Sequence, residues 1–363
     1  MKNKLKRFNY KNLIPISLDI NLAMDVEQLL NGGFKPLRTF MNYTTLNSVL
    51  EHMRLPSGQI WPVPILFHSP LNMKIYVGDS LLLKIHEHEL AILKVSNIFK
   101  YNKTKLIKLF FGTESNQHPG VFQTKKLSNT FITGKLTRIE KLSKILKIPA
   151  LEPPEVKAII RKKKWKKITG FHTRNPPHRA HEFLQKNSLE NSDGLLIHPV
   201  VGSKKSGDFT NKAIIKSYTT YLEKYMPKKN VIFTPLLTYS RYAGPKEAVF
   251  TAIIRHNYGC THFIVGRDHT GVKNFYGKYD SQKIFKNFNN LGIKIISYDE
   301  PYFCKKCDQI TTSKTCPHNK KYYIEISGSK IRKAILNQSN ISDKLIRREV
   351  LLTLQKMKNI FVH

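Results

Sequence analysis

Short apolar runs alternate with longer segments of helical pattern between residues 167 and 298. The apolar runs fall at 167–172, 195–201, 230–236, 262–266 and 293–298. Helical patterns separate them over 178–189, 210–226 and 245–257, and Pro245 stands at a first-turn position where its missing N–H costs nothing. Strands and helices in alternation predict a parallel sheet with right-handed crossovers. Ligands of such a sheet bind at the carboxyl ends of its strands.

The first 150 residues have a different pattern. Short apolar runs at 61–67, 73–77 and 90–95 are separated by Gly, Pro and Asn, which is typical of a β-rich region. Helical periodicity is restricted to about 22–31 and 44–52. Prolines cluster between residues 149 and 154, and we interpret this cluster as a domain boundary.

Length and composition indicate a folded, multidomain protein. The chain has 363 residues, of which 40% are hydrophobic, so two or three cores are expected. No apolar stretch is long enough to cross a membrane. The basic amino terminus lacks the apolar run and the cleavage site of a signal peptide, so we expect a cytoplasmic protein without membrane partners.

The net charge allows two interpretations. Lys and Arg number 61 against 25 Asp and Glu, which leaves +36. Clustered cations would indicate a nucleic-acid-binding module. The lysines are instead scattered along the chain, and we favour compositional drift, with local attraction of anionic substrates and no specific nucleic-acid partner. A nucleic-acid-binding module remains the competing hypothesis, and it predicts tight binding that weakens steeply with salt.

The strongest candidate for chemistry is the segment HTRNPPHRAH, at residues 172–181, where a predicted strand ends and a helix begins. A helix start offers free amides and a positive dipole end, which suits phosphate. Two histidines three residues apart project from one face of the first turn, and an arginine can clasp an anion. The candidate residues are His172, Thr173, Arg174, Asn175, His178 and His181. A capped helix with two solvated histidines is the alternative.

Polar residues also follow the strand that ends near residue 265. The segment GRDHTG places Gly266, Arg267, Asp268, His269 and Thr270 at this second carboxyl end. Glycine lets a backbone approach a ligand closely, and packing alone rarely requires so many polar side chains between glycines. Between another strand and helix, Arg241 is predicted to reach the same edge of the sheet. An ordinary turn and a surface arginine are the alternatives.

Three of the four cysteines lie close together near a histidine. Clustering of this kind in a cytosolic chain favours a metal over a disulfide. Three thiolates and one imidazole complete a tetrahedral zinc site, so we predict a structural Zn²⁺ held by Cys304, Cys307, Cys316 and His318. A reduced cysteine cluster without metal is the alternative. Cys260 precedes an apolar run and is interpreted as a buried core residue.

Taken together, these motifs resemble the ATP sulfurylase (sulfate adenylyltransferase) family. The resemblance is carried in order by GGFKPLRTFM (32–41), MRLPSGQIWP (53–62), HTRNPPHRAH, RYAGPKEA (241–248), GRDHTG and ISGSKIR (326–332). The family commonly has glutamine where His172 stands and alanine where Thr270 stands. Several independent motifs in one order make chance agreement improbable.

The resemblance implies a fold and a domain plan. It implies an α/β chain with a β-rich, PUA-like domain over 1–152 and a catalytic, Rossmann-like nucleotidylyl transferase domain with a parallel sheet over 153–300. A small carboxyl-terminal domain with the zinc site would follow over 301–363. The implied form has a single activity and no kinase domain, and relatives are usually homo-oligomers, often dimers.

The resemblance also implies a reaction. A sulfate oxygen attacks the α-phosphorus of ATP in line, adenylylsulfate (APS) forms and magnesium pyrophosphate leaves, or the reverse occurs. By motif, His172 and Arg174 bind sulfate, with the Thr270 backbone nearby and Arg241 close to the anions. Roles at ATP fall to Thr173 and Asn175 at the α-phosphate, His178 and His181 at the leaving phosphates, and Gly266, Arg267, Asp268 and His269 at the adenosine. Another adenylyl transferase of the H-x-x-H group, with an organic or nucleotide acceptor, is the alternative.

Overall fold

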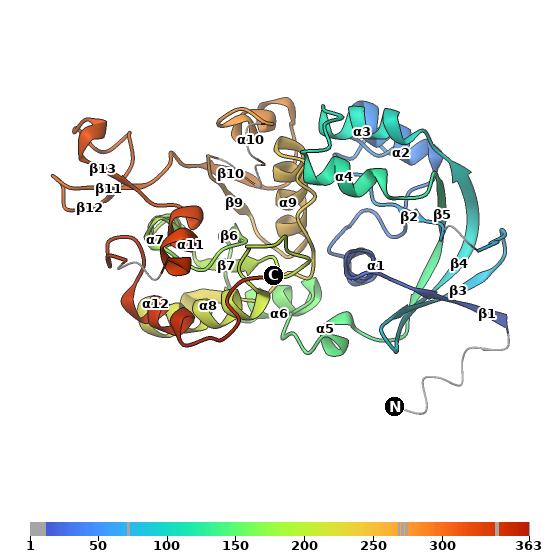
Figure 1. Cartoon of the computed structure of the whole chain (residues 1–363), viewed down its shortest axis with the longest axis horizontal. Coiled ribbons are helices and arrows are strands. Elements are labelled where there is room, and N and C mark those ends of the chain that lie inside the picture. Colours follow the sequence, from blue (N-terminus) through green and yellow to red (C-terminus); the bar gives the residue numbers. More distant parts are fainter. Residues whose placement is uncertain are drawn as a thin grey trace. The chain divides into compact units, whose positions relative to one another are not determined.

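The chain forms two compact units, each with its own five-stranded sheet (Figure 1). The computed structural model describes residues 12–70, 73–267, 269, 272, 275–337 and 341–362. The first unit comprises Met1–Pro149 with Arg241–Ala243, and the second comprises Ala150–Ser240 with Gly244–His363. Within the described residues, none of the helices is both long and apolar enough to span a bilayer.

The first unit is built on a five-stranded sheet in the order β1-β3-β4-β5-β2. Its outer pair β1–β3 is parallel and the other pairs are antiparallel. The strands are β1 (Leu13–Ser17), β2 (Phe67–His68), β3 (Ser80–Ile85), β4 (His88–Lys100) and β5 (Thr130–Arg138). The helices are α1 (Ile20–Asn31), α2 (Tyr43–His52), α3 (Lys103–Phe111), α4 (Pro119–Lys125) and α5 (Leu142–Ile145). Trp61 is fully buried in this unit and meets Phe34 edge to face at 5.9 Å between ring centroids.

Two of the apolar runs in this β-rich unit do not form the strands that their pattern suggested. Of the run 61–67, only Phe67 lies in a strand, because Pro62 and Pro64 cannot donate to a ladder. The run 73–77 contains no strand, and Tyr76 and Val77 are exposed by 64% and 63% beside a turn. A short apolar run that has no neighbouring strand to pair with does not form a strand.

Helical content in this unit exceeds the prediction. Helix α3 buries Leu106, Ile107, Phe110 and Phe111, a spacing that follows one helical face. Its ends are closed by the Asn102 side chain, which accepts from the Lys105 amide, and by a left-handed glycine at the carboxyl end. The predicted helices at 22–31 and 44–52 are confirmed as α1 and α2.

The second unit contains the predicted parallel sheet, which is confirmed. Five strands run in the order β10-β9-β6-β7-β8, and all neighbours are parallel. The strands are β6 (Ile168–Thr173), β7 (Gly194–Pro199), β8 (Val231–Phe233), β9 (His262–Val265) and β10 (Lys294–Ser297). Helices of the unit are α6 (Pro153–Lys162), α7 (Arg179–Leu189), α8 (Asn211–Tyr225), α9 (Pro245–Asn257), α10 (Asp280–Lys283), α11 (Gly328–Leu336) and α12 (Arg348–Gln355).

Both faces of this sheet are covered. On one face Phe171 and Ile197 share a core with Tyr218 of α8, and the same core takes in Ile331 of α11 and Val350 of α12. Residues after 301 therefore share a core with the parallel sheet. On the other face, a Cβ added to Gly170 would lie 2.9 Å from the Arg255 side chain, so the glycine lets α9 pack closely against β6.

A small antiparallel sheet forms the rest of this unit. Its strands β11 (Tyr302–Cys304), β12 (Gln309–Thr311) and β13 (Tyr323–Glu325) pair in the order β12-β11-β13. It carries the clustered cysteines and is drawn in orange and red in Figure 1.

Candidate functional site

The strand order places the two polar segments side by side. Strands β6, β7 and β8 run outward in one direction, and β9 and β10 run outward on the other side of β6. The order therefore switches between β6 and β9, where Gly170 pairs with Phe263. Open α/β sheets bind ligands in the crevice at the carboxyl ends of the strands at such a switch point. The HTRNPPHRAH and GRDHTG segments both begin there.

Two histidines meet across this switch point. The imidazoles of His172 and His269 lie 4.6 Å apart between ring centroids, with 38° between their planes. His269 Nε2 shares a hydrogen bond of 2.7 Å with the Thr251 hydroxyl of α9. Both ring nitrogens of His172 are buried and lack a hydrogen-bond partner among the residues that the structure describes. Unsatisfied buried donors at a crevice are the groups that a polar ligand satisfies.

A buried arginine lies behind these histidines. Arg255 of α9 is 0% exposed, and its Nη2 donates to the His198 carbonyl at 2.9 Å. Within the described part of the chain it has no carboxylate partner, and its Nε has no acceptor. Burial lowers the pKa of Arg255 to about 10, so it stays cationic at neutral pH.

Burial, together with this positive charge, keeps the nearby imidazoles neutral. Burial, and then the charges of Arg255 and Arg174, lower the pKa of His269 to about 3. Burial, with Arg255 as the next cause, also holds the pKa of His172 well below its usual range. An uncompensated buried charge favours entry of an anion.

The start of α7 organises the second pair of histidines. His178 is the N-cap, and its Nδ1 accepts a hydrogen bond of 3.3 Å from the His181 amide. Its proton therefore resides on Nε2, which is left to donate. The two rings stack with centroids 3.7 Å apart. Burial lowers the pKa of His178 to about 3, and burial also lowers the pKa of His181.

A tight turn positions the residues between these pairs. The Asn175 amide donates to the Thr173 hydroxyl at 3.1 Å, and that hydroxyl donates to the Asn175 carbonyl at 3.2 Å. A Cβ added to Gly328 would lie 2.7 Å from Asn175 Nδ2, so the ISGSKIR segment packs directly against this turn. Ser327 caps α11 by accepting a hydrogen bond of 3.3 Å from the Lys330 amide.

The other predicted site residues were Arg267, Gly266, Asp268, Thr270 and Arg241, and each is described by its own contacts. Arg267 pairs with Glu300 at 2.6 Å between Nη1 and Oε2, and both side chains are partly exposed. Gly266 has open space around its Cα. Asp268 and Thr270 lie outside the described residues. Arg241 belongs to the first unit, where its guanidinium, 7% exposed, forms an ion pair with Asp25.

Two cations near the turn were not singled out from the sequence. Lys204 lies on the loop after β7, and Arg332 lies one turn into α11. Position at the carboxyl end of a strand was the available signal for Lys204. Arg332 belongs to the ISGSKIR motif, for which the sequence predicted no role.

The cysteine cluster has the dimensions of a tetrahedral metal site. Sγ of Cys304, Cys307 and Cys316 and Nδ1 of His318 all lie within 4.8 Å of one another. Cys307 Sγ is 3.7 Å from Cys316 Sγ, and the three sulfurs lie 3.5, 3.2 and 3.8 Å from His318 Nδ1. A zinc with Zn–S bonds of about 2.3 Å requires ligand separations of about 3.5 to 3.8 Å. The residues therefore fit zinc, and His318 fits the fourth position.

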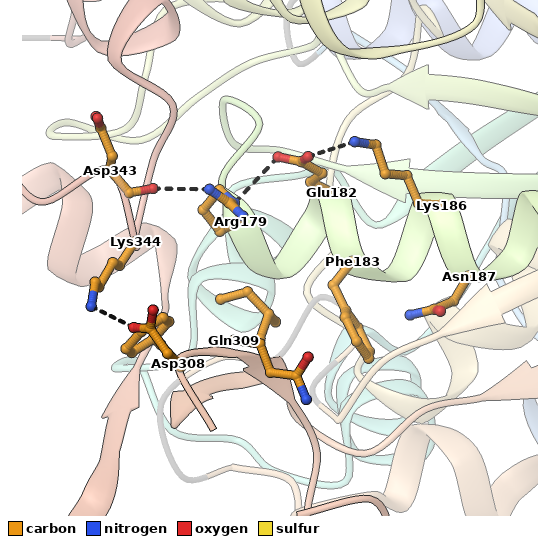
Figure 2. A pocket seen from close by; sticks show the side chains of 11 residues that line it. Arg179, Glu182, Phe183, Lys186, Asn187, Asp308, Gln309, Asp343 and Lys344 are labelled. Carbon is orange, nitrogen blue, oxygen red and sulfur yellow. Dashed lines mark hydrogen bonds and ion pairs between the residues drawn. The ribbon is translucent and has the colours of Figure 1, made fainter. Parts of the chain in front are cut away.

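A cavity of about 430 Å³ lies between α7 and the small antiparallel sheet (Figure 2). Its charged side chains pair with one another, as Figure 2 shows: Lys186 with Glu182 at 2.7 Å, and Lys344 with Asp308 at 2.8 Å. Arg179 donates to the Asp343 carbonyl at 3.2 Å. Arg179 Nε, which is buried without a hydrogen bond to any described residue, lies 3.4 Å from Glu182 Oε2. The charges of this cavity are therefore largely compensated by one another, unlike that of Arg255 at the switch point.

The fold and the site are those of a nucleotide-binding α/β domain that handles anions. Comparison with known proteins gives the family. Residues 149–357 match the ATP-sulfurylase family model, and residues 2–141 match that of a PUA-like domain. The chain belongs to the ATP-sulfurylase family.

Relatives match along almost the whole chain. A sulfate adenylyltransferase of Ignicoccus hospitalis is 40% identical, covering 97% of this chain and 93% of its own. One of Pyrococcus abyssi is 37% identical, covering 96% and 91%. A solved structure described as a hexameric APS kinase from Thiobacillus denitrificans superimposes with a TM-score of 0.75 at 20% identity. The match covers 99% of this chain but 65% of that one, and it shows a common fold.

Proposed function

We propose that this protein is a sulfate adenylyltransferase, which converts ATP and sulfate to APS and pyrophosphate, or catalyses the reverse reaction. Family membership and the names of its relatives support the activity. The observation that carries the proposal is the contact of His172 with His269, 4.6 Å apart, above a buried arginine that has no carboxylate partner among the described residues. This arrangement suits two anions that must be brought together.

The proposed sulfate subsite lies at the end of β6. His172 and Arg174 bind the anion there, and the backbone of Thr270 is assigned to it by motif. A neutral His172 donates one hydrogen bond, and Arg174 supplies the charge. The potential of the buried Arg255 adds to this attraction without contact.

The proposed ATP subsite extends along both segments. Thr173 and Asn175 contact the α-phosphate, and their turn is already formed by its own hydrogen bonds. His178 and His181 contact the leaving phosphates at the start of α7, where the free amides also favour negative charge. The adenosine lies along Gly266, Arg267, Asp268 and His269.

The proposed reaction is a direct displacement. A sulfate oxygen forms a bond to the α-phosphorus while the bond from that phosphorus to the bridging oxygen breaks, and the electron pair leaves with pyrophosphate. The Nε2 proton of His178 can hydrogen-bond this developing charge, because Nδ1 is engaged by the helix. Positioning and charge stabilisation then supply the catalysis, without a covalent intermediate. Mg²⁺ enters as the counter-ion of the ATP phosphates.

We also propose a structural zinc, a homo-oligomer and a cytoplasmic location. The four-ligand cluster supports zinc by its dimensions. The structural relative is described as hexameric, which supports an oligomer, and we propose a dimer as its basic unit. Reduced cysteines at a metal site are typical of the cytosol, where ATP is abundant.

The decisive experiment measures pyrophosphate release from ATP with and without sulfate, and ATP formation from APS and pyrophosphate. Arg174→Ala should lower turnover about hundredfold or more, because it removes the charged clasp on an anion. Arg161→Ala, on an exposed position of α6, is the matched control. Release that needs no sulfate, or that occurs with another acceptor, would identify a different adenylyl transferase.

A further inference from the structure

The loop after β7 brings a lysine close to the turn at Thr173–Asn175, which is proposed to contact the α-phosphate. The Val200 amide donates to the Thr173 carbonyl at 2.9 Å, which ties the start of this loop to the end of β6. Lys204 Nζ donates to the carbonyl of the same Val200 at 3.0 Å. Val200 therefore links the two residues: its amide contacts Thr173, and its carbonyl holds the ammonium of Lys204. This single carbonyl occupies one of the three N–H donors of the Lys204 ammonium.

Further charges surround this lysine. On the same loop, Asp208 pairs with Arg332 of α11 at 3.1 Å between Oδ1 and Nη2. Arg332 Nε is buried and has no partner among the described residues. Arg174, Arg332 and Asp208 all lie within electrostatic range of Lys204. Asp208 is thus already paired with Arg332, and the ammonium of Lys204 has only the Val200 carbonyl among the residues that the structure describes.

An excess of buried positive charge is unfavourable until an anion enters. Burial first, and then the charge of Arg174, lower the pKa of Lys204 to about 7, whereas Asp208 raises it. A polyanion with several oxygens would favour the charged state of the lysine and would accept hydrogen bonds from its remaining N–H groups. The cluster is therefore suited to a phosphate chain rather than to a neutral group.

We propose that Lys204 is a binding residue for the β- and γ-phosphates of ATP, and hence for pyrophosphate. The inference rests on the proposed function and deepens it. The sheet order supports phosphate over sulfate: β7 flanks β6 on one side, whereas the His172–His269 pair lies on the β9 side. A phosphate chain that starts at Thr173 and extends away from that pair reaches the β7 loop.

The test compares Lys204→Met with Lys205→Met. Lys205 is the next residue and is exposed, so it controls for loss of one positive charge from the same loop. For Lys204→Met we expect the KM for ATP and for pyrophosphate to rise about tenfold or more, because a charge-assisted hydrogen bond is lost. The KM for sulfate should change little. Lys205→Met should match the wild type, and Lys204→Arg should restore most of the affinity.

Calorimetric titration with inorganic pyrophosphate separates this inference from the proposed activity, because it needs no turnover. Weaker binding by Lys204→Met alone supports the role of Lys204 even if the wild type adenylylates another acceptor. Unchanged pyrophosphate affinity in a variant with wild-type thermal unfolding overturns the inference. A selective rise in the KM for sulfate also overturns it and places the lysine in the sulfate subsite. If Lys204→Met unfolds, Lys204→Gln takes its place in both assays, because its amide can still donate to the Val200 carbonyl while the charge is lost. Pyrophosphate affinity equal to that of the wild type in this variant overturns the assignment.

Discussion

His172 at the end of β6 faces His269 beyond the end of β9, with 4.6 Å between the centroids of their rings. Burial and neighbouring positive charge lower the pKa of both imidazoles, so both are neutral at physiological pH. In the site that we propose, the charge that attracts two anions thus comes from arginines, and the histidines act as neutral donors. This division of roles leads to the following predictions.

His172→Gln should keep the KM for sulfate within about tenfold of the wild type, because an amide replaces one neutral donor with another. His172→Leu removes the donor and should raise that KM about tenfold or more. The sulfate dependence of pyrophosphate release, measured between pH 6 and 8, checks both expectations. Because His172 is neutral throughout this range, the profile of His172→Gln should superimpose on the wild type. A wild-type KM that falls tenfold on acidification, with a flat profile in His172→Gln, would instead show a protonated His172.

His178→Asn should separate the helix cap from the chemistry. The asparagine side chain can accept a hydrogen bond from the His181 amide as histidine does, so the free energy of unfolding at pH 7 should change by less than about 1 kcal/mol. Turnover should fall about hundredfold, because the Nε2 donor to the leaving group is lost. Equal losses of stability and activity would show a purely structural residue.

The same variant predicts a pH effect on stability. His178 has a pKa of about 3 when folded, against an ordinary value of 6.5. Below 6.5 the unfolded chain binds a proton that the folded chain does not, so this histidine destabilises the fold increasingly as pH falls towards 3. His178→Asn should remove up to about 1.4 kcal/mol of that loss for each pH unit. Urea unfolding at pH 7 and pH 5 measures the difference.

Arg255→Met should weaken the attraction of sulfate without removing a group that contacts it. The guanidinium has no carboxylate partner among the residues that the structure describes, so its charge acts on the crevice. Sulfate should raise the midpoint of thermal unfolding of the wild type clearly more than that of the variant. The KM for sulfate should rise about tenfold. Equal stabilisation of both proteins by sulfate would show that Arg255 serves packing alone.

Zinc should be bound in about one equivalent per chain. Cys307→Ser should lose the metal and lower thermal stability, because the small antiparallel sheet has little core of its own. Cys260→Ser is the matched control: Cys260 is buried beside Gly170 of β6 and is not part of the cysteine cluster, so this variant should keep the metal content of the wild type. Metal analysis of the purified proteins checks this, and wild-type protein that is fully stable without bound metal would refute the zinc site.

Local patterns were sufficient for much of the second unit and failed in parts of the first. Buried strands such as β7 are mostly apolar, so they can be recognised without knowledge of their neighbours. The run 61–67 is also apolar, but its prolines and its missing partner strand keep it out of the sheet. Helix α3 has a regular helical pattern of buried residues but only nine residues, and it was not predicted.

By itself, the sequence determined the alternation of strands and helices, the order of the motifs and the residue types available for anions and metal. These features depend on neighbours along the chain, where periodicity and caps act. Only the tertiary structure decided which residues share a crevice, because sheet order places β9 beside β6 while β7 and β8 lie on the other side. The burial of Arg255 and the position of Lys204 near Thr173 depend on packing between distant segments, which sets desolvation and charge, and no local pattern encodes them.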